Sequence, residues 1–197
     1  MQNKPKPLYI TGSLIKHMVQ KRNNMELDII NLLEKQNYHL RGIAKELNES
    51  HSTVLRKLNK LIKTKVIDYK KEGKNKIFFI KKNIISKNYI LQAEIHKINL
   101  LIEKHPELMI IIEEILKKTE EKLIIIFGSY AKSTEKNNSD IDIYIETKNK
   151  NIKKLIENIN SKINVKIGPF NKESNLIKEI IKNHIIIRGL ENFYEKK

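Results

Sequence analysis

Two aspartates separated by one residue, Asp140 and Asp142, are the side chains best suited to chemistry. Polar residues and isoleucines alternate from 140 to 146, which predicts a strand with Asp140, Asp142, Tyr144 and Glu146 on one polar face. Because side chains two residues apart on a strand project side by side, the two carboxylates can share a hard cation. Mg²⁺ prefers such oxygen ligands and keeps positions open for substrate phosphates.

A Gly-Ser pair precedes the aspartates and supplies groups of the opposite kind. The apolar run at 123–127 ends at Gly128, which predicts a buried strand that leads into a short helix. The free N–H groups at the start of this helix and the Ser129 hydroxyl can bind a triphosphate, with Lys132 as electrostatic support. The pattern therefore predicts a phosphate cradle facing a metal-binding pair.

Gly-Ser, ten further residues and Asp-x-Asp on a strand resemble the signature of polymerase-beta-type nucleotidyltransferases, and most closely the minimal enzymes of archaea and bacteria. The resemblance implies that Asp140 and Asp142 are catalytic and bind Mg²⁺. It also implies that Gly128, Ser129 and Lys132 bind ATP or another nucleoside triphosphate. The nucleotidyl (AMP) group would pass to a hydroxyl of a protein, such as a toxin, or of a small molecule.

The same family has a third carboxylate on a later strand, and this chain differs there. The nearest predicted strand carries Asn164 and Lys166 on its polar face. Two alternatives stay open. Either the domain transfers nucleotides, with Glu146 or Glu173 as the missing acid, or it is inactive and serves a transcriptional regulator as nucleotide sensor or dimerisation part.

The surrounding elements predict a compact domain over residues 119–190. Apolar periodicity after the second strand indicates two helices and two strands, and only a tail at 191–197. Their order fits a polymerase-beta-like nucleotidyltransferase domain with a small mixed sheet flanked by helices. The predicted elements are a helix at 150–161, a strand at 163–167, a helix at 173–183 and a strand at 184–189.

A different pattern occupies residues 25–82. Apolar residues at helical spacing predict three helices, at 25–36, 40–47 and 51–64, and two strands follow at 66–71 and 76–80. The third helix is expected to bury one face, formed by Val54, Leu55, Leu58, Leu61 and Ile62.

This order resembles the winged helix-turn-helix of archaeal and bacterial regulators, in which the third helix enters the DNA major groove. The formal charge of +16 supports a polyanionic partner, because residues 1–82 hold 19 Lys and Arg against 7 Asp and Glu. Double-stranded DNA is therefore the expected partner, although such a domain can also bind proteins. The expected DNA-binding residues are Ser52, Thr53, Arg56, Lys60, Lys70, Lys71 and Lys74.

The two halves are joined by a predicted helical linker at 83–118. Leu91, Ile95, Ile98 and Ile102 repeat at intervals of four and three, which fits either a homodimeric coiled coil or packing on the chain's own domains. Residues 1–22 predict a basic arm or helix. The chain has no cysteine and no apolar run of membrane-spanning length, so we expect an α+β, cytoplasmic protein without disulfides.

Overall fold

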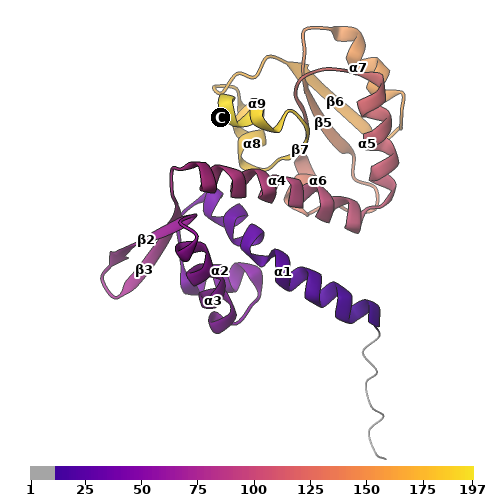
Figure 1. The fold of residues 1–197 in the computed structure, drawn as a ribbon. Helices are drawn as coiled ribbons and strands as arrows, with labels where there is room; N and C mark the ends of the chain where they lie inside the picture. The colour runs from indigo at the N-terminus through magenta and orange to yellow at the C-terminus, as the bar shows by residue number, and fades with distance from the viewer. Residues whose placement is uncertain (1–11) are drawn as a thin grey trace, which may run out of the picture. The chain divides into compact units, whose positions relative to one another are not determined.

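The computed structural model describes residues 12–197, with side-chain surroundings from residue 24 onward, so residues 1–11 of the predicted arm lie outside the described part (Figure 1). The chain divides into two compact units after Tyr89, here called the N-terminal and the C-terminal unit. Helices and two separate sheets make up the units, which confirms the predicted α+β class.

The N-terminal unit has the element order of a winged helix-turn-helix. Its three-stranded antiparallel sheet has the order β1-β3-β2, and β2 and β3 form the predicted hairpin. One long helix replaces the two predicted before residue 37, because no proline or glycine interrupts the chain there. The elements are α1 (Gly12–Lys35), β1 (Tyr38–His39), α2 (Leu40–Leu47), α3 (His51–Lys63), β2 (Ile67–Glu72) and β3 (Asn75–Ile80).

Helix α3 begins at a side-chain cap and is held by a buried ion-pair cluster. The Ser50 hydroxyl accepts a hydrogen bond from the Thr53 backbone N–H at 3.2 Å. Glu26 on α1 is 5% exposed and accepts hydrogen bonds from Lys57 (3.1 Å) and Lys60 (2.9 Å). These contacts fix the rotation of α3, so that its opposite face is turned to solvent.

This rotation corrects one prediction. Val54, Leu58 and Leu61 are fully buried as expected, but Leu55 is 42% exposed, and Lys57 is buried in its stead. The apolar pattern alone could not distinguish these positions, because Leu55 lies at the border of the apolar face. Tertiary contacts decide it, and here Lys57 forms a hydrogen bond with the buried Glu26 of α1.

The C-terminal unit contains a four-stranded mixed sheet of order β6-β5-β4-β7. Strands β5 and β6 are parallel, and the other neighbours are antiparallel. The element after the last strand, α9, was expected to be a tail. The elements are α4 (Ile84–Lys104), which begins before the unit, α5 (Glu107–Lys118), β4 (Ile124–Phe127), α6 (Gly128–Lys132), β5 (Ile141–Glu146), α7 (Lys150–Glu157), β6 (Ile163–Gly168), α8 (Asn175–Lys182), β7 (Ile185–Arg188) and α9 (Leu190–Lys196).

Both faces of this sheet are covered, as Figure 1 shows. One face packs on α5 and α7 through residues such as Ile126, Ile143 and Ile112. The other packs on α8 and α9, where Tyr144 is 1% exposed among apolar neighbours. On the face of β5 expected to be polar, Tyr144 is therefore part of the core, whereas Asp142 and Glu146 are half-buried and Asp140 is exposed just before the strand.

The predicted linker helix has a mixed role. Ile98 and Ile102 of α4 pack against the core beside α5, whereas Ile95 is 53% exposed. Two residues of the predicted coiled-coil seam, Ile98 and Ile102, thus pack on the chain's own C-terminal unit, which is the second alternative given for this helix.

Candidate functional sites

Asp142 lies at the point where three strands and the cradle meet. In the sheet it is paired with Phe127 at the end of β4 and with Asn164 on β6. Gly128 has a φ of +71°, and a Cβ atom there would stand 2.2 Å from Asp142 Oδ2. Only glycine therefore allows the backbone at the start of α6 to lie directly against this carboxylate.

The other predicted nucleotide residues lie on α6 or immediately before β5. Ser129 is half-buried in the first turn of α6, and Asp140 is exposed immediately before β5. Lys132 forms a 2.6 Å ion pair with Glu179 of α8, and both side chains are about 40% exposed. Because an exposed pair is weak, a phosphate can compete with Glu179 for Lys132.

Asn164 occupies the position beside the aspartate pair. Its side-chain amide Nδ2 donates a hydrogen bond to Asp142 Oδ1 at 2.8 Å, whereas Lys166 is exposed and paired with Tyr144. An amide can ligate a cation through its oxygen, but it cannot accept a proton as a carboxylate does. The structure therefore distinguishes the two residues that the sequence left open.

Neither glutamate expected as a substitute acid faces the aspartates freely. Glu146 accepts hydrogen bonds from Lys196 Nζ at 2.5 and 2.6 Å, and one from the Phe170 backbone N–H at 3.4 Å. The Glu173 side chain is 85% exposed and is paired with Lys178 at 3.3 Å. Glu146 is thus held by other partners, whereas the exposed pair of Glu173 with Lys178 is weak.

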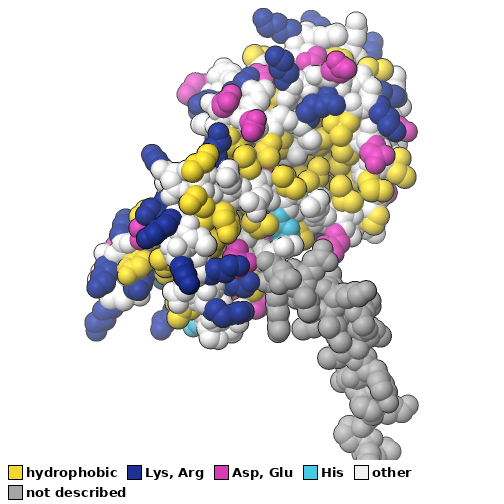
Figure 2. Space-filling view, in the orientation of Figure 1, with side chains coloured by type: hydrophobic (Ala, Val, Ile, Leu, Met, Phe, Trp, Pro, Cys, Tyr) yellow, Lys and Arg dark blue, Asp and Glu magenta, His cyan; other side chains and the backbone are white. Residues whose placement is uncertain are grey.

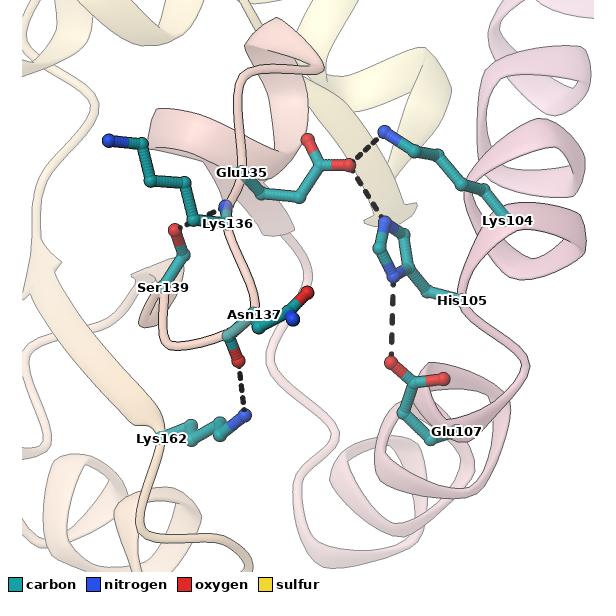
Figure 3. Close-up of polar contacts among 8 residues, drawn as sticks. All are labelled: Lys104, His105, Glu107, Glu135, Lys136, Asn137, Ser139 and Lys162. Carbon is teal, nitrogen blue, oxygen red and sulfur yellow. Dashed lines mark hydrogen bonds and ion pairs between the residues drawn. The ribbon is translucent and has the colours of Figure 1, made fainter.

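The loop between the cradle and Asp140 is anchored by a buried carboxylate, Glu135 (Figure 3). Glu135 Oε1 accepts hydrogen bonds from Lys104 Nζ and, at 2.8 Å, from His105 Nε2. Burial alone raises the pKa of Glu135, but these two donors outweigh it and lower the pKa to about 2. The anchor was not predicted, because its members lie some 30 residues apart and form no motif.

The chemistry of these donors fits Mg²⁺ in part. Asp140 and Asp142 offer the oxygen ligands that Mg²⁺ prefers, and the backbone at Gly128 lies directly against Asp142 Oδ2. Among the described residues, no group of three or more His, Cys, Asp or Glu side chains could hold a metal ion. A cation held by the two aspartates would need further ligands, for which Mg²⁺ commonly uses water or substrate oxygens.

The outer face of α3 is the candidate DNA surface. Ser52, Arg56 and Lys60 are exposed, but Lys60 also bonds to Glu26. The Thr53 hydroxyl is half-buried and accepts a hydrogen bond from Ser50 Oγ at 2.8 Å, so it supports the helix cap. Arg56 and Lys63 are exposed cationic side chains of α3 for which no ion pair is found among the described residues.

Lys and Arg side chains gather over the β2–β3 hairpin in Figure 2. Lys70 pairs with Glu72 at 2.6 Å, whereas Lys71 is placed opposite Lys76 on the neighbouring strand. Like charges opposite each other weaken a hairpin, and phosphate binding would relieve this repulsion. The tip adds exposed Lys74 beside Gly73, whose φ is +58°.

None of the described helices is long and apolar enough to cross a membrane. No curated protein matches the chain significantly. Among solved structures, the adhesin competence repressor AdcR from Streptococcus pyogenes is similar at 22% identity and a TM-score of 0.38, over 55% of this chain and 92% of that one. Residues 108–188 match the family model described as "Nucleotidyltransferase domain", and the C-terminal half of the chain therefore contains a nucleotidyltransferase domain.

Proposed function

We propose that this chain is a DNA-binding regulator whose nucleotidyltransferase domain binds a nucleoside triphosphate together with Mg²⁺. The observation that carries the nucleotide part is the contact between Gly128 and Asp142, which joins the phosphate cradle to the aspartate pair inside the matched domain. The exposed face of α3 and the lysines of the hairpin support the DNA part.

Different residues of the site bind the phosphates and the cation. The N–H groups at the start of α6 and the Ser129 hydroxyl donate to phosphate oxygens, while Asp140 and Asp142 hold the cation. A bound Mg²⁺ supplies neutralisation of phosphate charge and alignment for in-line displacement. Lys132 adds positive charge once it leaves Glu179.

Nucleotide sensing is the outcome that the site favours over turnover. Asn164 lies where the family resemblance implies an acid, and it bonds to Asp142 in place of accepting a proton. Transfer of a nucleotidyl group to a hydroxyl of a protein or small molecule is the second candidate. It is favoured by the retained Asp140 and Asp142 within the matched domain.

Nucleotide binding is tested by titrating the full-length protein with labelled ATP, with and without Mg²⁺. Mutating a residue that only supports metal ligands already weakens metal binding roughly 10–100-fold. The double variant Asp140→Asn with Asp142→Asn removes the ligands themselves, so its Mg²⁺-dependent affinity for ATP is expected to fall by more than that. Gly128→Ala is expected to lose binding as well, because the added Cβ would displace Asp142.

Gly73→Ala is the matched control for Gly128→Ala. Gly73 has a similar positive φ, +58°, but nothing lies within 4 Å of an added Cβ. Both variants bear the backbone strain of about 1–2 kcal/mol, and only Gly128→Ala meets a carboxylate. If the wild type does not bind ATP, or if both glycine variants bind it equally well, the proposed nucleotide site is wrong.

DNA binding is tested by measuring how the affinity of the full-length protein for duplex DNA falls with salt. Each phosphate contact contributes about 0.9 to the log–log slope, so Lys71→Ala with Lys74→Ala is expected to reduce the slope by about 2. Lys154→Ala, an exposed lysine on α7, is expected to leave the slope unchanged. Salt-independent binding, or none, would refute the DNA proposal.

A further inference from the structure

One apolar side chain of helix α3 is exposed among polar neighbours. Among the described side chains of the N-terminal unit, three large hydrophobic residues are exposed, Leu55 (42%), Ile84 (68%) and Ile85 (43%), and Leu55 is the one that lies on α3. Val54, which precedes Leu55, and Leu58, which lies three residues after it, are fully buried. Scattered exposed leucines are common on proteins, so the position of Leu55 is what gives it meaning.

Leu55 lies on the outer face of α3 beside polar side chains. It is three residues after Ser52 and four before Asn59, so it is next to both on the helix surface. Ser52, Arg56 and Asn59 are exposed, and Arg56 follows Leu55 directly. The face thus offers a hydroxyl, a guanidinium, an amide and one branched apolar group within two turns.

These four groups match the features that base pairs present in the major groove. Arginine bonds to guanine, an amide bonds to adenine, and an apolar side chain contacts the methyl group of thymine. The ion pairs of Glu26 with Lys57 and Lys60 fix the rotation of α3, so Leu55 cannot turn inward without breaking them. Its exposure is therefore built into the packing of the unit.

We propose that Leu55 is a specificity-determining residue that recognises the methyl group of a thymine in the DNA target. This inference rests on the proposed DNA-binding function, and it adds one specific base contact to that function. Thymine is the expected contact because it is the base that carries a methyl group in the major groove. The apolar contact gives selectivity, whereas the lysines of the β2–β3 hairpin contribute affinity without sequence preference.

The experiment first selects binding sites from random duplex DNA with the full-length wild-type protein. Each thymine of the selected site is then replaced by deoxyuridine, which removes only the methyl group. Wild type is expected to lose affinity about fourfold at one position of each site, the value for exposing one buried methyl group. Leu55→Ala is expected to bind both duplexes equally, with an unchanged melting temperature.

Two further variants complete the design. Arg56→Ala is expected to keep the deoxyuridine effect while it relaxes selection at another base pair. Ile110→Ala removes a more exposed apolar side chain, 62% against 42% for Leu55, from α5 and is expected to behave as wild type. If wild type selects a sequence but Leu55→Ala shows the same deoxyuridine effects, the role of Leu55 is refuted while DNA binding stands. If wild type binds no DNA, both the proposed DNA binding and the proposed role of Leu55 are refuted.

Discussion

Replacing Asn164 with aspartate is expected to increase nucleotidyl transfer by roughly 10²- to 10⁴-fold, the usual contribution of a general base. Asn164 is paired with Asp142 in the sheet and touches its carboxylate, so the new carboxylate would stand beside Asp142, where the family resemblance implies a third acid. The measurement uses ATP labelled on its α-phosphate, with Mg²⁺ and cell extract, and follows transfer of the label.

The same variant has a second, independent readout. Two carboxylates side by side repel each other, so Asn164→Asp is expected to melt at a lower temperature than wild type without Mg²⁺ and to recover when Mg²⁺ is added. Lys166→Asp is the matched control, because Lys166 is exposed and is paired with Tyr144. Equal gains from both variants, or transfer by wild type at full rate, would contradict the sensor interpretation.

Replacing Glu94 with alanine is expected to lower the free energy of unfolding by about 3 kcal/mol, because it leaves buried donors without their acceptor. Glu94 is 2% exposed in α4, and its Oε1 accepts hydrogen bonds from Lys97 (2.5 Å), Tyr194 (2.9 Å) and His184 (3.3 Å). His184 also bonds to the Ile180 carbonyl at 2.8 Å. One carboxylate thus ties α4 to α8 and α9.

The pH dependence of this contribution follows from the Glu94 pKa. Burial raises the pKa of Glu94, but the bonds and charges of His184 and Lys97 outweigh burial and lower it from 4.5 to about 2. Because the pKa is lower in the folded state, the stabilisation is complete above pH 4.5 and is lost as the pH falls toward 2. Urea unfolding of wild type is therefore expected to show declining stability across this range.

Glu94→Gln and Glu113→Gln separate this effect from general acid sensitivity. The glutamine at position 94 has no carboxylate to protonate, so its stability should fall less between pH 4.5 and 2. Glu113 is exposed on α5, and its replacement should change stability by less than about 0.5 kcal/mol. A wild-type pH profile identical to that of Glu94→Gln would show that Glu94 contributes no such stability.

Local patterns in the sequence determined most elements of both units. The strands β4 and β5 follow from an apolar run that ends in glycine and from strict alternation, and α2 was predicted at its exact bounds. Local signals suffice there because side-chain periodicity and turn residues act over a few neighbours. The same signals placed Gly128 and Asp142 in adjoining elements, and the sheet register brings them into contact.

Only the tertiary structure decided the position of side chains whose partners are distant in the chain. The sequence could not choose between Asn164 and Lys166, because the choice depends on the register of β6 against β5. It placed Leu55 in the core, because Glu26, which turns α3, lies about 30 residues away. Burial at the border of an apolar face is decided by the elements that pack there, and no local pattern records them.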